Sequence, residues 1–96
     1  MPAYMVAQYR SVKEYAAYRT AVAELNRKYG ARILTQSGTA RCIEGEWNHD
    51  SMVIIEFASL TVAQQFYQSE EYAAVKALRQ GAPPISIVIV DGVPGE

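Results

Sequence analysis

The sequence predicts an α+β fold in which helices cover only one face of a sheet. Two segments, 52–55 and 85–90, are almost entirely apolar, and neither alternates cleanly between apolar and polar positions. Strands with this pattern are usually buried on both faces. The chain has two amphipathic helical stretches, which are enough to cover one face. A second copy of the chain is therefore expected to cover the other face in a homodimer.

The first third of the chain is expected to form a strand followed by a helix. Residues 3–9 are mostly apolar and predict the strand. Ser11 and Glu14 have the spacing of a capping box, which marks the start of a helix, and Gly30 marks its end. Apolar side chains recur along this helix every three or four residues and form its buried stripe: Tyr15, Tyr18, Val22, Leu25 and Tyr29.

Two extended segments, 31–36 and 40–44, follow this helix. We predict that they form one long strand, bent by a bulge at Gly38, which pairs with a strand at 51–57. The polar turn between the two paired strands is rich in turn-forming residues. The alternative is a two-residue hairpin turn at Ser37 and Gly38.

The second half of the chain is expected to add two helical pieces and a last strand. Ser59 has the position of an N-cap for the first piece. Ser69, followed by two glutamates, starts the second piece, which ends before Gly81 because the prolines that follow cannot continue a helix. With a last strand at 85–90, the order is β-α-β-β-α-β. This order is ferredoxin-like, with a four-stranded antiparallel sheet and two helices on one face.

Five motifs stand out along the chain: YAAYR at 15–19, YGAR at 29–32, EGEW at 44–47, IEFAS at 55–59 and YQSEEY at 67–72. In this order they resemble the motifs of the domain of unknown function 1330 family. The resemblance implies membership of the dimeric α/β barrel superfamily, in which the ferredoxin-like sheets of two subunits pack together. That superfamily includes cofactor-free monooxygenases, haem-degrading enzymes and isomerases, so the resemblance implies the fold and leaves the activity open.

Composition and charge restrict the expected partners and compartment. We interpret the 96 residues as a single dimeric α/β barrel domain, with a core at 3–90 and a loose tail at 91–96. The 9 basic and 10 acidic residues are interspersed, which predicts no binding to nucleic acid or to a membrane. Cys42 is the single cysteine and is expected to be buried and unreactive. The absence of a secretion signal predicts a cytoplasmic protein.

Arg32 and Glu56 are the charged residues most suited to catalysis. Each lies in a predicted strand among apolar neighbours, and pairing of the long strand with residues 51–57 would bring the two side chains together. Arg32 could then anchor an anion or enolate while Glu56 acts as a general base. The alternative is a structural ion pair, or a charge that reaches solvent at the edge of a strand.

Four aromatic residues are candidates for ligand binding: Tyr18, Trp47, Tyr67 and His49. Several aromatic side chains around a cleft between helices and sheet would suit an aromatic or carbonyl-bearing small molecule. The alternatives are core packing for Tyr18 and a plain surface position for His49. A single histidine and a single cysteine give little support to a metal site, and no motif points to a cofactor.

These observations predict a small-molecule-binding domain, which could act as a cofactor-independent enzyme on a small polar or aromatic metabolite. One alternative is a non-catalytic dimeric interaction or regulatory module. A haem-handling monooxygenase is less favoured, because haem iron needs an axial ligand and the chain offers one histidine in a turn. An apolar cleft with a few convergent polar groups would favour the binding domain, and a filled cleft would favour the interaction module.

Overall fold

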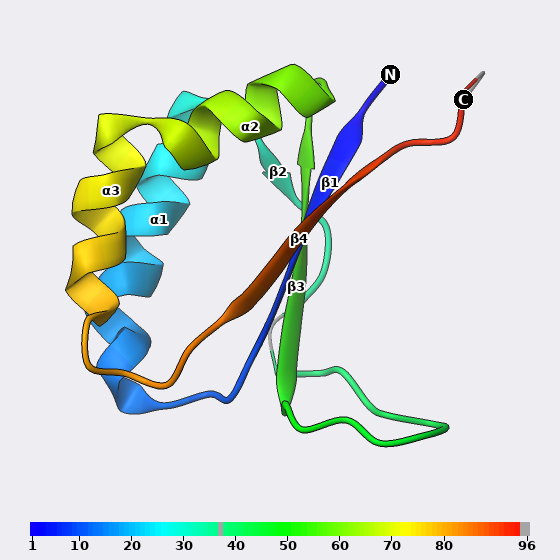
Figure 1. Ribbon diagram of the computed structural model, residues 1–96, viewed down its shortest axis with the longest axis vertical. Coiled ribbons are helices and arrows are strands. Elements are labelled where there is room, and N and C mark those ends of the chain that lie inside the picture. The colour runs from blue at the N-terminus through cyan, green and yellow to red at the C-terminus, as the bar shows by residue number, and fades with distance from the viewer. Residues whose placement is uncertain (37, 95–96) are drawn as a thin grey trace.

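The computed structural model describes residues 1–36 and 38–94, and its elements follow the predicted order (Figure 1). Within these residues, four antiparallel strands form a sheet in the order β2-β3-β1-β4. The strands are β1 (Ala3–Tyr9), β2 (Arg32–Ile33), β3 (Ser51–Phe57) and β4 (Ser86–Asp91). The helices are α1 (Ala16–Lys28), α2 (Leu60–Gln68) and α3 (Glu70–Lys76), with 3₁₀ turns η1 (Lys13–Tyr15) before α1 and η2 (Ala77–Arg79) after α3. The predicted ferredoxin-like α+β fold is confirmed.

All three helices lie on one side of the sheet (Figure 1), which therefore has a covered and an uncovered face. Side chains alternate between the two faces along each strand. Met5 of β1 packs into the core beneath the helices, and the strand register places Ile55 and Ile89 beside it. The covered face consists mainly of Met5, Ala7, Val53, Ile55, Ile87 and Ile89. The uncovered face carries Tyr4, Val6, Leu34, Met52, Ile54, Val88 and Val90. Both faces are apolar, as the strand pattern predicted.

Aromatic rings form the centre of the core, where α2 and α3 meet the sheet. Phe66 of α2 is 1% exposed, and its ring centroid lies 5.1 Å from that of Phe57 and 5.2 Å from that of Tyr72. Buried rings at these separations supply a large share of the apolar area that a small domain hides from water. The α2 helix begins at the predicted N-cap, because the Ser59 hydroxyl accepts a hydrogen bond from the Val62 N–H at 3.1 Å.

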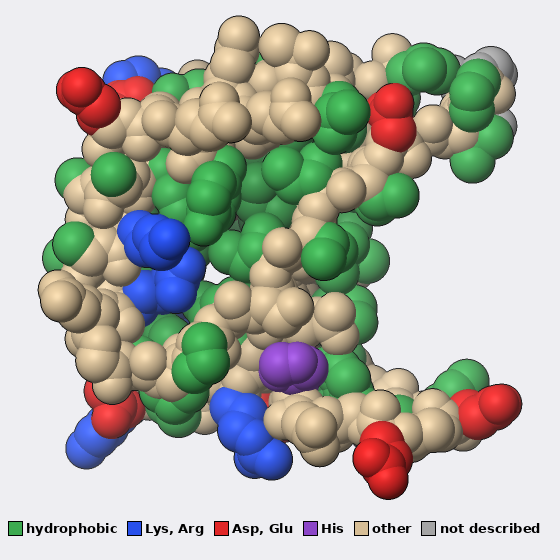
Figure 2. All heavy atoms as spheres, in the orientation of Figure 1, with side chains coloured by type: hydrophobic (Ala, Val, Ile, Leu, Met, Phe, Trp, Pro, Cys, Tyr) green, Lys and Arg blue, Asp and Glu red, His purple; other side chains and the backbone are tan. Residues whose placement is uncertain are grey.

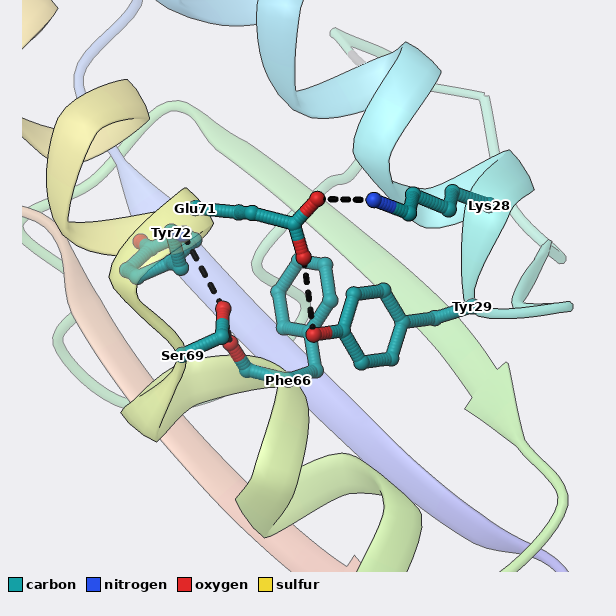
Figure 3. A network of polar contacts seen from close by, with 6 residues as sticks. All are labelled: Lys28, Tyr29, Phe66, Ser69, Glu71 and Tyr72. Atoms are coloured by element: carbon teal, nitrogen blue, oxygen red, sulfur yellow. Dashed lines mark hydrogen bonds and ion pairs between the residues drawn. The ribbon is translucent and has the colours of Figure 1, made fainter.

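The chain changes direction between α2 and α3 at Ser69 (Figure 3). The Ser69 backbone is extended, and its hydroxyl accepts a hydrogen bond from the Tyr72 N–H at 3.0 Å. The same hydroxyl donates to the Phe66 carbonyl at 2.7 Å, so it satisfies groups at the end of one helix and the start of the next. The predicted restart of the helix at Ser69 is confirmed.

Figure 3 also shows how the end of α1 is joined to the start of α3. Glu71 forms an ion pair with Lys28 and accepts a hydrogen bond from the Tyr29 hydroxyl at 3.2 Å. The Lys28 ammonium lowers the pKa of Glu71, and Glu71 in turn raises the pKa of Lys28. Both side chains are exposed, so these contacts orient the two helices more than they add to stability.

The start of the first helix differs from the prediction. The N-cap of η1 is Val12, which has no side-chain acceptor, and α1 begins only at Ala16. Ser11 instead donates its backbone N–H to Oδ1 of Asp50 at 2.8 Å, which ties it to the residue before β3. The predicted capping box is therefore wrong, because the Ser11 N–H, which would bond to the Glu14 side chain in a capping box, bonds to Asp50 instead.

The predicted long strand at 31–44 is wrong beyond its first residues. β2 ends at Ile33, and one more backbone bond joins the Leu34 N–H to the Ile54 carbonyl at 2.8 Å. The Ile54 N–H then bonds to the Thr35 hydroxyl at 2.9 Å. A side chain has taken the place of the next backbone acceptor, so the ladder ends there.

Residues 40–44 form no strand. They belong to the loop that leads to β3, where Ile43 is 94% exposed. Cys42 is also exposed, against the expectation of a buried thiol, because the strand that would have buried it does not form. The alternative hairpin turn includes Ser37, which lies outside the described residues.

Candidate functional site

A cavity of about 600 Å³ lies on the covered side of the sheet, between α1 and the strands. Small side chains stand on both of its walls: Ala7 on β1, and Ala16 and Ala23 on α1. Side chains of this size cannot fill the space between a helix and a sheet, whereas protein interiors normally contain few voids larger than a water molecule. The volume falls within the range of small-molecule binding sites.

One buried polar side chain in the cavity wall has an atom without a hydrogen-bond partner. Asn26 of α1 is 3% exposed, and its Oδ1 forms no hydrogen bond within the described residues. A buried acceptor left unpaired costs about 1–3 kcal/mol. A donor on a molecule inside the cavity would remove this cost.

Two phenols in the cavity wall are linked to an arginine behind them. The hydroxyls of Tyr18 on α1 and Tyr72 on α3 lie 2.8 Å apart. The Arg79 guanidinium lies 5.0 Å from the centroid of the Tyr18 ring, and its Nη2 donates to the Tyr72 hydroxyl at 3.5 Å. Burial, and then the hydrogen bond with Tyr72, raises the pKa of Tyr18. A tyrosine whose pKa is raised keeps its proton at neutral pH, so the Tyr18 hydroxyl is better suited to donating a hydrogen bond than to accepting a proton.

The uncovered face is apolar and open. Val88 and Val90 are each 51% exposed, and Leu34 is 43% exposed. Figure 2 shows hydrophobic side chains along the side opposite the helices, between the C-terminal segment and the loop before β3. Contiguous apolar surface of this kind usually marks an interaction site.

Arg32 and Glu56 lie on this uncovered face. They are register partners in β2 and β3, and Nη2 of Arg32 lies 2.9 Å from Oε1 of Glu56. The side chains are 73% and 25% exposed, respectively. The structure brings the two predicted catalytic residues together, but on the side of the sheet away from the cavity. Their roles as anion anchor and general base stay predictions.

Trp47 and His49 lie in the loop before β3, beside the uncovered face. The Trp47 indole N–H donates to Oε1 of Gln8 at 2.7 Å, and Gln8 is the register partner of Met52 on that face. The rings of Trp47 and His49 are 6.0 Å apart, centroid to centroid. Neither of these two predicted ligand-binding residues lines the cavity.

Tyr67 of α2 lies at a second hollow, of about 470 Å³, between α3 and β4. Its ring centroid is 4.8 Å from that of Tyr72, and its hydroxyl accepts a hydrogen bond from Nζ of Lys76 at 3.2 Å. Figure 2 shows hydrophobic side chains and cationic groups where α3 faces β4. Of the six predicted site residues, Tyr18 lines the larger cavity, Tyr67 lines the second hollow, and the other four line neither.

Sequence reasoning missed Asn26, Tyr72 and Arg79 as site residues. A signal was present in their positions along the helices. Asn26 lies about two helical turns after Tyr18, and Arg79 lies about two turns after Tyr72, so each polar residue falls on the side that carries buried rings. A polar residue on the buried side of a helix needs a partner, which makes it a candidate for ligand contact.

The described residues contain no group of three or more His, Cys, Asp or Glu side chains that could hold a metal ion. None of the described helices combines the length and the apolar character that crossing a membrane requires.

Residues 2–93 match the family described as Domain of unknown function (DUF1330). The chain belongs to the DUF1330 family. The match extends over nearly the whole sequence and confirms the resemblance that the five motifs indicated. No protein with curated annotation matches this DUF1330 chain.

Solved structures of low sequence identity share the fold of this DUF1330 protein. A protein of unknown function from Rhodopseudomonas palustris has a TM-score of 0.75 at 17% identity, and the alignment covers 96% of this chain and 82% of that one. A dimeric ferredoxin-like protein of unknown function from Jannaschia sp. CCS1 has a TM-score of 0.66 at 10% identity, with coverages of 96% and 100%. An antibiotic biosynthesis monooxygenase has a TM-score of 0.56 at 10% identity, with coverages of 98% and 100%. At these identities the likeness shows the ferredoxin-like fold alone.

Proposed function

We propose that this DUF1330 protein is a homodimer that binds a small, mainly apolar molecule in the cavity between α1 and the sheet. The observation that carries the proposal is the unpaired Oδ1 of Asn26, buried in the wall of an apolar cavity of about 600 Å³. Tyr18 and Tyr72 add two hydroxyl groups to the same walls. Small-molecule sites usually have this form, with apolar walls and a few polar groups that fix the orientation of the ligand.

The homodimer part of the proposal is supported by the uncovered face. Val88 and Val90 on this face are half exposed, and the helices already cover the opposite face. A second sheet packed against it would hide this surface. The structurally similar Jannaschia protein is described as dimeric.

A cofactor-independent enzyme that uses the same cavity is the second candidate. It is favoured by the hydroxyl pair of Tyr18 and Tyr72, with the Arg79 guanidinium next to both rings. A phenol that keeps its proton could stabilise negative charge developing on a carbonyl oxygen, and the nearby cation would strengthen that effect.

The binding of N-phenyl-1-naphthylamine tests the proposal, since the fluorescence of this neutral probe rises in an apolar site. We expect the wild-type protein to bind the probe. Ala23→Phe, which places a ring in the cavity wall, is expected to weaken binding at least tenfold. Ala17→Phe is the matched control, because Ala17 is exposed on the same helix and does not line the cavity.

Equal probe binding by Ala23→Phe and the wild type would place the probe elsewhere and overturn the proposal. Native mass spectrometry of protein from its own cells would reveal a ligand that co-purifies with it. If the wild type binds neither the probe nor such a ligand, the interaction module is favoured. Sedimentation of the wild type as a stable monomer at micromolar concentration would remove the homodimer.

A further inference from the structure

The second hollow adjoins the cavity. Ile85 and Ile87 belong to the walls of both. Tyr72 lies in the wall of the larger cavity, and its ring packs against that of Tyr67 in the wall of the smaller hollow. A molecule bound in the cavity therefore lies close to whatever side chains surround the second hollow.

Two cations, Lys76 and Arg79, stand in the walls of the second hollow. No carboxylate is among its lining residues in the described part of the chain. The ion pairs found in that part of the chain join Lys28 to Glu71 and Arg32 to Glu56, and neither involves these two cations. Within the described residues, these two cations therefore form no ion pair.

Arg79 lines the second hollow and contacts two residues of the cavity wall from that side. Its guanidinium lies over the ring of Tyr18 and bonds to the hydroxyl of Tyr72, both of which are cavity walls. Its Nε is buried and forms no hydrogen bond within the described residues. A half-buried guanidinium whose neighbours are phenols, and which still has unused N–H donors, is suited to an anionic oxygen.

We propose that the ligand is an apolar carboxylate, with its hydrocarbon or aromatic part in the cavity and its carboxylate held by Arg79 beside Lys76. This inference rests on the proposed function, because it names the class of molecule that the same cavity takes. The planar guanidinium matches the two oxygens of a carboxylate, whereas the ammonium of Lys76 acts as a point charge. The apolar walls weaken screening by water and so strengthen the attraction.

A matched pair of probes separates this inference from the proposed function. 2-Naphthoate and 2-naphthamide have the same ring and nearly the same shape, but only the first is an anion. Isothermal titration calorimetry of the wild-type protein is expected to give a dissociation constant at least tenfold lower for 2-naphthoate. In Arg79→Gln the two probes should bind equally, and Arg79→Lys should keep part of the preference because it keeps the charge.

Arg19→Gln is the control for charge in general, because Arg19 lines the cavity itself whereas Arg79 lines the second hollow. Loss of the preference in Arg19→Gln but not in Arg79→Gln would overturn the assignment to Arg79. Equal binding of both probes by the wild type would overturn the carboxylate class and leave the proposed function standing. Binding of neither probe at millimolar concentration would remove both. If circular dichroism shows that Arg79→Gln is unfolded, the preference of Arg79→Lys for 2-naphthoate over 2-naphthamide, compared with that of the wild type, still decides the outcome.

Discussion

The two faces of the sheet are built from similar apolar residues, but they differ in what lies over them. On the covered face, Met5 and Ile55 are almost fully buried beneath the helices, and a cavity remains where small side chains meet. On the uncovered face, Val88 and Val90 are half exposed, and an ion pair between Arg32 and Glu56 lies among the apolar residues. One face therefore offers a partly open cavity for a small molecule, and the other offers an exposed apolar surface for another protein chain.

This difference shows why residue type alone does not locate a site. Arg32 and Glu56 have the chemistry of a catalytic pair, yet they lie on the face that we propose to be covered by a second subunit. Asn26 and Tyr72 attract less attention in the sequence, yet they line the cavity, and Arg79 bonds to the Tyr72 hydroxyl. The comparison of the two faces leads to the following predictions.

Truncation of a ring on the covered face should have the largest effect. Phe66→Ala removes a ring that contacts Phe57 and Tyr72, and we expect the free energy of unfolding to fall by about 3–5 kcal/mol. Urea unfolding at one fixed protein concentration measures this change. Leu78→Ala is the control, because Leu78 is 48% exposed, and it should cost less than about 1 kcal/mol. Equal costs for the two variants would contradict the assignment of the core.

A charge on the uncovered face should have the next largest effect, and it should act on assembly rather than on folding. Val88→Asp would place an unpaired carboxylate between two packed sheets, which we expect to raise the dimer dissociation constant by roughly a hundredfold or more. Analytical ultracentrifugation measures this constant. Ala74→Asp, on the exposed side of α3, should leave it unchanged. An unaltered dimer in Val88→Asp would mean that the subunits meet elsewhere.

Removal of one charge from the Arg32–Glu56 ion pair should affect dimer association at the uncovered face without affecting ligand binding in the cavity. Glu56→Gln is expected to leave binding of N-phenyl-1-naphthylamine in the cavity unchanged, because the sheet lies between them. Its effect on dimer association should be about 1 kcal/mol or less, because Arg32 is 73% exposed on the edge strand β2, where its unpaired charge can still reach water at the rim of an interface. Fluorescence titration and ultracentrifugation measure the two quantities. Loss of probe binding in Glu56→Gln would instead support the predicted role of Glu56 at the ligand.

The smallest effect is expected at the edge between the faces, where Asp50 joins two loops. Its carboxylate accepts hydrogen bonds from the Ser11 N–H and the Ser51 hydroxyl, which lower the pKa of Asp50. A carboxyl with a lowered pKa adds stability above its unfolded-state value of about 4. This contribution is lost as the pH falls through the folded-state value.

Asp50→Asn should therefore lower the urea midpoint slightly at pH 7, and the difference from the wild type should shrink at pH 3. Glu44→Gln, in the same loop and exposed, is the control for a general loss of charge. A difference that persists unchanged at pH 3 would show that the carboxylate charge is not the cause.

Local patterns were sufficient for the elements that depend on neighbouring residues. The caps at Ser59 and Ser69 form as predicted, because a serine before a helix bonds to an N–H only three residues ahead. The apolar runs at 52–55 and 85–90 correctly indicated two apolar faces, because side chains alternate across any strand. The Arg32–Glu56 pairing also followed from strand register.

Other features depended on residues far apart in the chain. Ser11 has the local form of a cap, but it bonds to Asp50 instead. The strand predicted at 40–44 does not form, because the Thr35 hydroxyl replaces a backbone acceptor of the ladder. Of the predicted site residues, Tyr18 and Tyr67 both contact Tyr72, which the sequence analysis did not single out, and their roles stay predictions.

By itself, the sequence determined the order of strands and helices, their amphipathic sides and the need to cover both faces of the sheet. Only the tertiary structure decided which face carries each polar residue and where space remains. The cavity exists because Ala7 on a strand and Ala23 on a helix are both too small to meet across the gap. Periodicity reports which way a side chain points, whereas a volume is set by pairs of side chains that come together only when the chain has folded.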